Sequence, residues 1–282
     1  MALAPETLAL VGAGAGVGWL VGCSGVGGGA VMTPLLYLGF GLPLPVAVGT
    51  DLWFAALTKS SATVSYVRAG MVNWSIARRL AAGRLPAALG CAVALRALQA
   101  DPARLQSVLE LVLGLVLALS ALLIGLRALS LHGDTPMVPA APATHPELPP
   151  PAAAMQVGCA GPAPMVGAGA LVGSIVMLTS VGAGALGTAA IAALHPTLPA
   201  RRLVASELAH ATLLAGIGGL LYGAFGLVDW PVLALLLAGS LPGSWAGTRM
   251  ARRLPDHWLR SGIALLLAAV ALHLLLAVPA GH

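Results

Sequence analysis

Residues 8–40, LALVGAGAGVGWLVGCSGVGGGAVMTPLLYLGF, form an uncharged apolar run that is longer than one membrane crossing needs. A transmembrane helix takes about 20 apolar residues. The glycines at 27–29 interrupt this run, and each glycine weakens a helix by about 1 kcal/mol relative to alanine. In a membrane, broken backbone persists only where it is buried in protein or lines a cavity. We therefore expect two half-helices or a re-entrant hairpin in this segment.

The composition of the whole chain also points to a membrane. Its 282 residues are 59% hydrophobic and 8% charged, whereas soluble domains carry about 25% charged residues. This excludes a soluble enzyme core and predicts an all-α polytopic membrane protein. Further apolar segments lie at 44–67, 74–95, 105–129, 160–194, 203–225, 230–250 and 259–278. The residues before the first apolar run include an acid, Glu6, and no basic residue. A signal peptide begins with a basic region, so we expect that the first helix is retained and no signal peptide is cleaved.

The chain contains an internal repeat. Three motifs of the first half recur in the second half at an offset of 156 residues, and a fourth recurs at 155. The pairs are 49–52 with 205–208, 70–74 with 226–230, 83–86 with 239–242, and the glycine-rich 25–30 with 180–185. Four ordered matches predict two duplicated four-segment halves, each beginning with a glycine-broken or re-entrant segment. The expected organisation is a first repeat at 1–129, a proline-rich linker at 130–160 and a second repeat at 161–282.

The arginines bear on the orientation of the two repeats, because cytoplasmic connections are enriched in Lys and Arg. Two clusters flank connections of different parity: Arg68, Arg78, Arg79 and Arg84 in the first half, and Arg249, Arg252, Arg253 and Arg260 in the second. If both connections are cytoplasmic, the repeats are inverted, and we favour this arrangement. Parallel repeats stay open, because four arginines do not follow the pattern: Arg96, Arg104, Arg201 and Arg202.

Two acids, Asp51 and Glu207, occupy equivalent positions in the repeats. A charged side chain inside a bilayer costs about 2.5–3.5 kcal/mol on insertion scales and usually has a function. His210 shares a helical face with Glu207 and titrates near physiological pH, so we predict that Asp51, Glu207 and His210 handle protons. The alternatives are helix-start capping by the acids and an interhelical hydrogen bond by the histidine. Lys59 either pairs with Asp51 or an anion, or snorkels to an interface.

The two interrupted segments predict the substrate site. Corresponding broken helices in two repeats form binding sites in transporters, because free helix ends present N–H groups to an anion. Hydroxyl groups beside the breaks add donors. The expected binding residues are Ser24, Gly27, Gly28, Gly29, Thr50, Ser180, Gly182, Gly184 and Ser206. The alternative is that these small residues serve close helix packing alone.

Other features predict structure rather than chemistry. The cysteines are three and widely spaced, so we expect no disulfide, no metal and no cofactor; Cys23 is the one beside the glycine-rich element. Trp74 and Trp230 are expected at the membrane interface, each after a polar residue that caps a helix. Without a Ser/His/Asp array at one depth we expect no enzyme. Arginines at segment edges argue against nucleic-acid binding.

These motifs resemble the sulfite exporter TauE/SafE family, also called TSUP transporters. The resemblance rests on 25–29 with Pro34, 47–50 and 70–74 in the first half, and on 180–187, 204–210, 228–230 and 239–243 in the second. It implies a multi-pass protein of the bacterial inner membrane that moves small sulfur-containing anions such as sulfite, sulfonates or sulfoacetate. The family pattern Val-Gly-[Ser/Thr]-Asp is replaced by Val-Ala-Ser-Glu at 204–207, which bears on site size and coupling ion.

The leading hypothesis is therefore a proton-coupled secondary transporter that exports a small sulfur anion, in which one repeat rocks against the other. A passive anion channel or uniporter on the same repeat is the alternative, and a non-transporting membrane partner protein is a third. The many small residues suggest a homodimer in the lipid bilayer.

Overall fold

The computed structural model describes residues 5–24, 29–129, 162–182, 184–194, 200–250, 265, 267–274 and 276. The helices are α1 (Pro5–Ser24), α2 (Gly29–Pro34), the π-helix η1 (Leu35–Gly39), α3 (Leu44–Arg68), α4 (Trp74–Leu98), α5 (Pro102–Leu129), α6 (Pro162–Thr179), α7 (Ala185–Leu194), α8 (Ala200–Ala224) and α9 (Trp230–Met250).

The prediction of an all-α polytopic membrane protein is confirmed. Every regular element in the described ranges is a helix, and residues 267–274 add a further helical stretch. Within the described part of the chain, three stretches are long and apolar enough to cross a membrane: Trp74–Leu98, Pro102–Leu123 and Arg202–Ala224. The linker predicted at 130–160 lies outside the described residues.

The long segment of the second half is broken, as expected. α6 ends at Thr179 and α7 begins at Ala185. Between them Ser180 has a φ of 57° and Gly182 a φ of 99°, which a right-handed helix cannot contain. In the first half α1 ends before α2 begins, and the break predicted at 25–28 lies outside the described residues.

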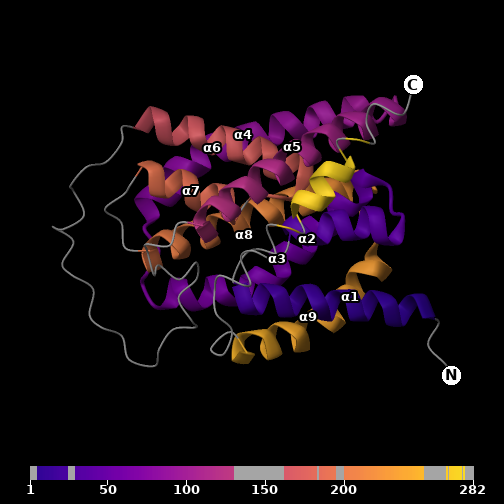
Figure 1. Ribbon diagram of the computed structural model, residues 1–282. Helices are drawn as coiled ribbons and strands as arrows, with labels where there is room; N and C mark the ends of the chain where they lie inside the picture. The colour runs from indigo at the N-terminus through magenta and orange to yellow at the C-terminus, as the bar shows by residue number, and fades with distance from the viewer. Residues whose placement is uncertain are drawn as a thin grey trace.

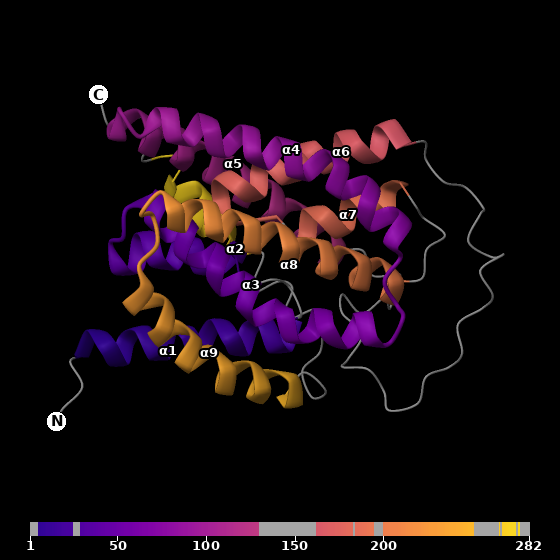
Figure 2. The ribbon, with the colours of Figure 1, turned by 180° about the vertical axis from the view of Figure 1, so that it is seen from behind.

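The most extensive contacts between the two halves occur in three helix pairs of the described part of the chain. α1 packs along α9, α4 along α6 and α3 along α8 (Figures 1 and 2). Glycines let backbones approach in the first two pairs: a Cβ on Gly239 would overlap the carbonyl of Val11, and one on Gly83 would overlap that of Val166. The two contacts correspond under the offsets of 156 and 155 residues, so the same interlock occurs twice.

The directions of these helices match inverted repeats. α3 and α8 are antiparallel, since Leu52 contacts the Gly218 position while the hydroxyls of Thr63 and Thr212 share a 2.8 Å hydrogen bond. The equivalent helices α1 and α6 run in opposite directions (Figure 1). An inverted duplication produces such an arrangement, and we interpret the fold in this way.

A turn with a capping residue joins α3 to α4, and an equivalent turn joins α8 to α9. Asn73 accepts hydrogen bonds from two backbone N–H groups in the first turn of α4, and Asp229 accepts one from the first turn of α9. The capping predicted at these positions is confirmed. Trp74 and Trp230 follow the caps and are 57% and 53% exposed, as residues at a membrane interface would be.

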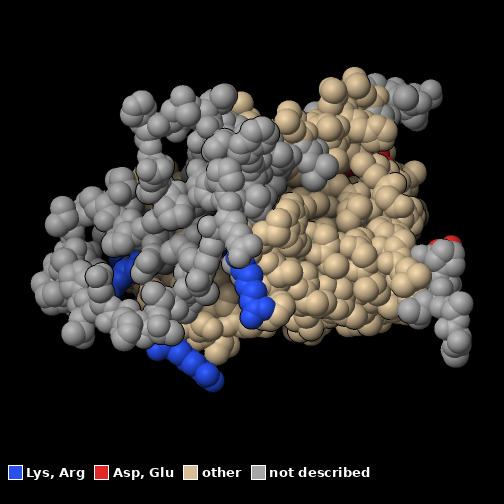
Figure 3. Space-filling model, turned by 60° about the horizontal axis from the view of Figure 1, so that its bottom comes forward, with Lys and Arg blue, Asp and Glu red and all other residues tan. Residues whose placement is uncertain are grey.

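One face of α5 is buried in the helix bundle and the other face is exposed. Leu105, Leu109 and Leu113 are buried on one face of the helix, whereas Leu111 and Leu115 are exposed on the other. Figure 3 shows a broad face of described residues almost free of charge, with basic side chains gathered toward one end. An extended apolar exterior of this kind suits contact with lipid.

Candidate functional site

The two equivalent acids are buried in the helix bundle. Asp51 on α3 is 0% exposed and Glu207 on α8 is 1% exposed. An ionised carboxylate in apolar surroundings needs a cation or hydrogen-bond donors. Both acids have partners, and the partly buried Lys59 interacts electrostatically with each of them. Their direct contacts differ.

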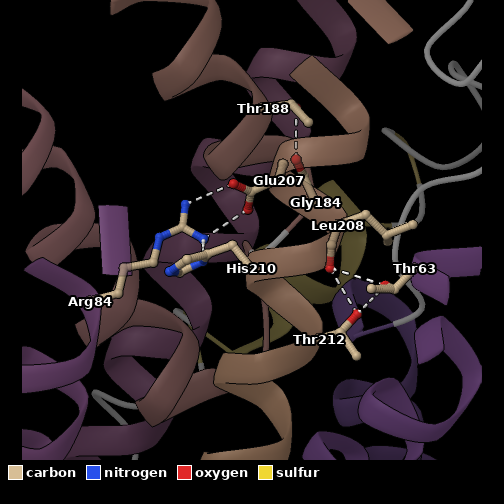
Figure 4. A network of polar contacts seen from close by, with 8 residues as sticks. All are labelled: Thr63, Arg84, Gly184, Thr188, Glu207, Leu208, His210 and Thr212. Carbon is tan, nitrogen blue, oxygen red and sulfur yellow. Dashed lines mark hydrogen bonds and ion pairs between the residues drawn. The ribbon is translucent and has the colours of Figure 1, made fainter. Parts of the chain in front are cut away.

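Glu207 is held by Arg84 of α4 in a two-pronged ion pair (Figure 4). Arg84 Nη1 lies 3.0 Å from Glu207 Oε1, and Nη2 lies 3.0 Å from Oε2. The side chains are 0% and 2% exposed. Two parallel N–H···O bonds are the geometry in which guanidinium recognises oxyanions. The pair neutralises both charges inside the bundle.

His210 completes this network. Its Nδ1 lies 3.0 Å from Arg84 Nη1. Because a guanidinium only donates hydrogen bonds, Nδ1 is the acceptor, and the ring proton is on Nε2. His210 is therefore neutral in this conformation. Nε2 is buried without a hydrogen-bond partner in the described part of the chain.

Two glycines let the broken segment of the second half close around the pair. A Cβ on Gly173 of α6 would lie 2.7 Å from Arg84 Cα, and a Cβ on Gly187 of α7 would overlap the Glu207 carboxylate. Side chains at these positions would displace the ion pair. The glycine-rich sequence thus shapes the site as well as the break.

Asp51 has a neutral partner instead. Thr33 of α2 donates a 2.6 Å hydrogen bond to Asp51 Oδ2, while Oδ1 is buried and has no partner among the described residues. Ser180, at the break after α6, lies close enough to interact with this carboxylate, although its hydroxyl makes no hydrogen bond to a described residue.

The broken segments of the two halves meet beside Asp51. A Cβ on Gly29, at the start of α2, would overlap the Ser180 carbonyl and lie 3.2 Å from Asp51 Oδ2. The structure therefore brings Gly29, Ser180 and Asp51 together. Gly182 and Gly184 lie in the turn between α6 and α7.

Some predicted binding residues cannot be placed against this site. Gly27 and Gly28 lie outside the described residues. Ser24 is the last residue of α1, and its side chain lies outside the described part, as does that of Cys23. Their roles stay predictions.

Thr50 and Ser206 hold the interhelical turns of the opposite halves. Thr50 Oγ1 accepts a hydrogen bond of 3.0 Å from Asp229 N, and Ser206 Oγ accepts one of 2.8 Å from Asn73 N. Ser206 also donates to the carbonyl of Arg202. These equivalent contacts give both hydroxyls a structural role here, and substrate binding by them stays a prediction.

Arg84 is a candidate site residue that sequence reasoning placed wrongly. We expected it in an arginine cluster at a segment edge, whereas it is fully buried against Glu207. The reason is its depth: Arg84 follows ten residues of α4, where a charge must find a buried partner. The aligned motifs Gly-Arg-Leu-Pro at 83–86 and Gly-Ser-Leu-Pro at 239–242 carried this signal.

A second polar cluster joins η1 to α5, and sequence reasoning missed it as well. Tyr37 donates a 2.5 Å hydrogen bond to Glu110 Oε1, and Gln106 donates a 3.0 Å bond to the same oxygen. The signal was an acid inside the apolar run at 105–129. No group of three His, Cys, Asp or Glu residues that could hold a metal ion occurs within the described ranges.

A membrane protein with this site can be compared with known families. The family model for "Sulfite exporter TauE/SafE" matches residues 10–274. The chain belongs to the TauE/SafE sulfite exporter family. The match spans both halves, so the buried network lies within a family domain.

Two curated relatives come from Bacillus subtilis (strain 168). The "Probable membrane transporter protein YjnA" is 32% identical over 259 residues, which cover 92% of this chain and 96% of the relative. The "Probable membrane transporter protein YunE" is 40% identical over 67 residues, 24% of each chain. No solved structure matches significantly. This TauE/SafE protein is therefore a multi-pass membrane transporter.

Proposed function

We propose that this TauE/SafE protein is a secondary transporter that exports a small sulfur-containing anion, such as sulfite, a sulfonate or sulfoacetate, across the bacterial inner membrane. The observation that carries the proposal is the match to the sulfite exporter family over residues 10–274. A buried guanidinium, Arg84, suits such a substrate, since oxyanions bind guanidinium groups in two-pronged geometry.

Proton coupling is the second part of the proposal. Asp51 and Glu207 are carboxylates buried at equivalent positions, and intramembrane acids commonly mark proton pathways. His210 contacts the same guanidinium as Glu207. Glu207 and Asp51 would exchange protons with the aqueous phases, while His210 would accept one when Arg84 moves away.

The anion would enter between the two broken segments. Gly29 and Ser180 meet there, and backbone N–H groups of the α6–α7 turn, at Gly182 and Gly184, would complete the site. Rocking of one repeat against the other would then expose the site to each side of the membrane in turn.

Flux in liposomes tests this function. The purified full-length protein is reconstituted, and the movement of sulfite, sulfoacetate, sulfate and thiosulfate is followed with and without an imposed pH gradient. We expect uphill movement of sulfite or sulfoacetate driven by the gradient. Flux that follows only the anion's own gradient would indicate a channel or uniporter.

A variant separates coupling from binding. Glu207→Gln should abolish the response to the pH gradient while anion binding persists, because glutamine cannot take up the proton. The matched control is Glu110→Gln on α5, which makes the same change away from the Arg84 network. Unchanged pH-driven transport in Glu207→Gln would end the role of Glu207 in coupling.

A further inference from the structure

The Arg84 guanidinium is already bound to an oxyanion, which is the carboxylate of Glu207. Both terminal nitrogens lie 3.0 Å from carboxylate oxygens. Sulfite and sulfonate groups also present two oxygens that a guanidinium can bind in parallel. The Glu207 carboxylate thus occupies the place that a substrate oxyanion would take.

We propose that Arg84 is the ligand of the transported anion, which replaces Glu207 on the guanidinium when Glu207 takes up a proton. The inference rests on the proposed function, because it assumes a small oxyanion as substrate. In the conformation described here the site is closed, since Arg84 and Glu207 are 0% and 2% exposed. The anion therefore reaches Arg84 in an open conformation.

The exchange leaves the charge of the site unchanged. One proton from the aqueous phase forms an O–H bond on Glu207 and removes its negative charge. One monovalent anion then restores a negative charge beside Arg84. An unpaired ion in the bundle would be costly, so the proton and the anion bind well only together. Movement of this loaded state carries one proton with one anion in the same direction, so export follows the outward gradient of the anion and works against the inward proton gradient.

Two buried donors near the pair are available for such a ligand. Arg84 Nε and His210 Nε2 are both buried without hydrogen-bond partners in the described part of the chain. Both carry a hydrogen, since Nδ1 of His210 is the atom that accepts from Arg84. Buried donors without partners are unusual in folded proteins. Donors that lack acceptors make the surroundings of the pair favour a ligand rich in acceptor oxygens, such as an oxyanion.

The other charged groups around the pair favour an anion. His210 on α8 is neutral while it accepts from Arg84. Lys59 on α3 interacts electrostatically with Glu207 and Asp51. α6 and α7, which pack nearest through their glycines, contribute no titratable side chain in their described ranges.

Binding of sulfite to the purified full-length protein tests the exchange. Glu207→Gln imitates the protonated acid and frees the guanidinium, so the Kd for sulfite should fall by about tenfold or more, the value of one strong ionic hydrogen bond. The affinity of the unmodified protein should also rise on acidification more steeply than that of Glu207→Gln. Ionisation of sulfite itself affects both proteins alike.

A charge-neutral pair of substitutions removes the ligand without leaving a buried charge. Arg84→Gln combined with Glu207→Gln keeps hydrogen-bonding groups on both helices and should abolish sulfite binding. Arg84→Lys keeps the charge but loses the two-pronged geometry, and should raise the Kd by about tenfold. Ser240→Ala, at the equivalent position of the second half, is the matched control and should bind normally.

The outcomes distinguish this inference from the proposed function. If the unmodified protein transports sulfite but the double variant binds it with unchanged affinity, Arg84 is a structural residue and the exchange is wrong. Equal pH dependence in the unmodified protein and in Glu207→Gln would also reject the exchange. If the unmodified protein neither binds nor moves any sulfur anion, the proposed function fails and the inference fails with it.

Discussion

The two halves of the molecule place an acid at the same point of the fold and surround it differently. Asp51 receives a hydrogen bond from the neutral Thr33, whereas Glu207 is paired with the cation Arg84. The positions equivalent to Arg84 and His210 are occupied by Ser240 and Phe54. The scaffold is thus repeated while the chemistry is specialised around Glu207.

This difference teaches which contacts serve the fold and which serve the site. The close helix contacts at glycines recur in both halves, as do the hydrogen bonds of Thr50 and Ser206 to the interhelical turns. These contacts therefore maintain the shared framework. Arg84 and Lys59 have no charged counterparts, since Ser240 and Ala215 occupy the equivalent positions. Charged residues that occur in only one of two duplicated halves are candidates for a role in function, because the shared fold does not require them.

The largest expected effect comes from removing the cation that pairs with the acid of the second half. Arg84→Ala leaves Glu207 buried without a partner, which should lower the free energy of unfolding by about 3–5 kcal/mol. Chemical unfolding in detergent measures this change. Ser240→Ala, the equivalent substitution in the other half, should cost much less because Ser240 bonds only a carbonyl of its own helix.

A second substitution shows whether the loss comes from the unpaired charge. Glu207→Gln introduced into Arg84→Ala should recover most of the lost stability, because the buried carboxylate is then neutral. An Arg84→Ala protein as stable as the unmodified one, or no recovery in the double variant, would contradict the role of the ion pair.

The next effect tests why the second half has glycine where the first has a large side chain. A Cβ on Gly187 would overlap the Glu207 carboxylate, so Gly187→Ala should force the carboxylate away from Arg84 and cost about 1–3 kcal/mol. The equivalent residue is the buried Met32, beside an acid that is one methylene shorter.

Gly216→Ala on α8 provides the control for this substitution. No atom lies within 4 Å of the added Cβ, so Gly216→Ala should be neutral or stabilising by up to about 1 kcal/mol. Thermal unfolding of both variants measures the contrast. Equal stability of Gly187→Ala and Gly216→Ala would show that the close approach of α7 to Glu207 is not important.

The hydroxyl partner of Asp51 should matter less than the guanidinium partner of Glu207. Thr33→Val removes the donor to Asp51 with little change in shape, and should cost about 1–3 kcal/mol because a buried acceptor loses its bond. Thr58→Val is the control, since Thr58 bonds only carbonyls of its own helix. If Asp51→Asn abolishes the cost of Thr33→Val, the bond to the carboxylate is its cause.

The positions of the membrane helices could be predicted well from the sequence, because such helices are long, apolar and almost uncharged. The apolar segments at 44–67, 74–95 and 230–250 coincide closely with α3, α4 and α9, since a lipid environment dictates length and hydrophobicity. The break after α6 was predictable from its glycines, because left-handed backbone excludes a continuous helix. These features depend on local composition alone.

The site was predicted only in part, because partners across helices are not local. Asp51, Glu207 and His210 were identifiable as ionisable residues inside apolar runs. That Arg84 meets Glu207 depends on α4 and α8 lying side by side, which the sequence spacing of more than a hundred residues does not reveal. From the sequence alone, Arg84 therefore resembled the arginines at the edges of apolar segments.

The smallest expected effect concerns a feature that only the first half has. Tyr37→Phe removes one of two donors to Glu110, while Gln106 keeps its 3.0 Å bond, so the cost should be about 0.5–1.5 kcal/mol. The residue equivalent to Tyr37 is Ala192, and α7 therefore lacks this tether. Amide hydrogen exchange should accelerate in Gly29–Gly39 and stay unchanged in Ala185–Leu194. Unchanged exchange in both would mean that η1 is held by apolar packing, and the asymmetry of the halves would then be confined to the acids and their partners.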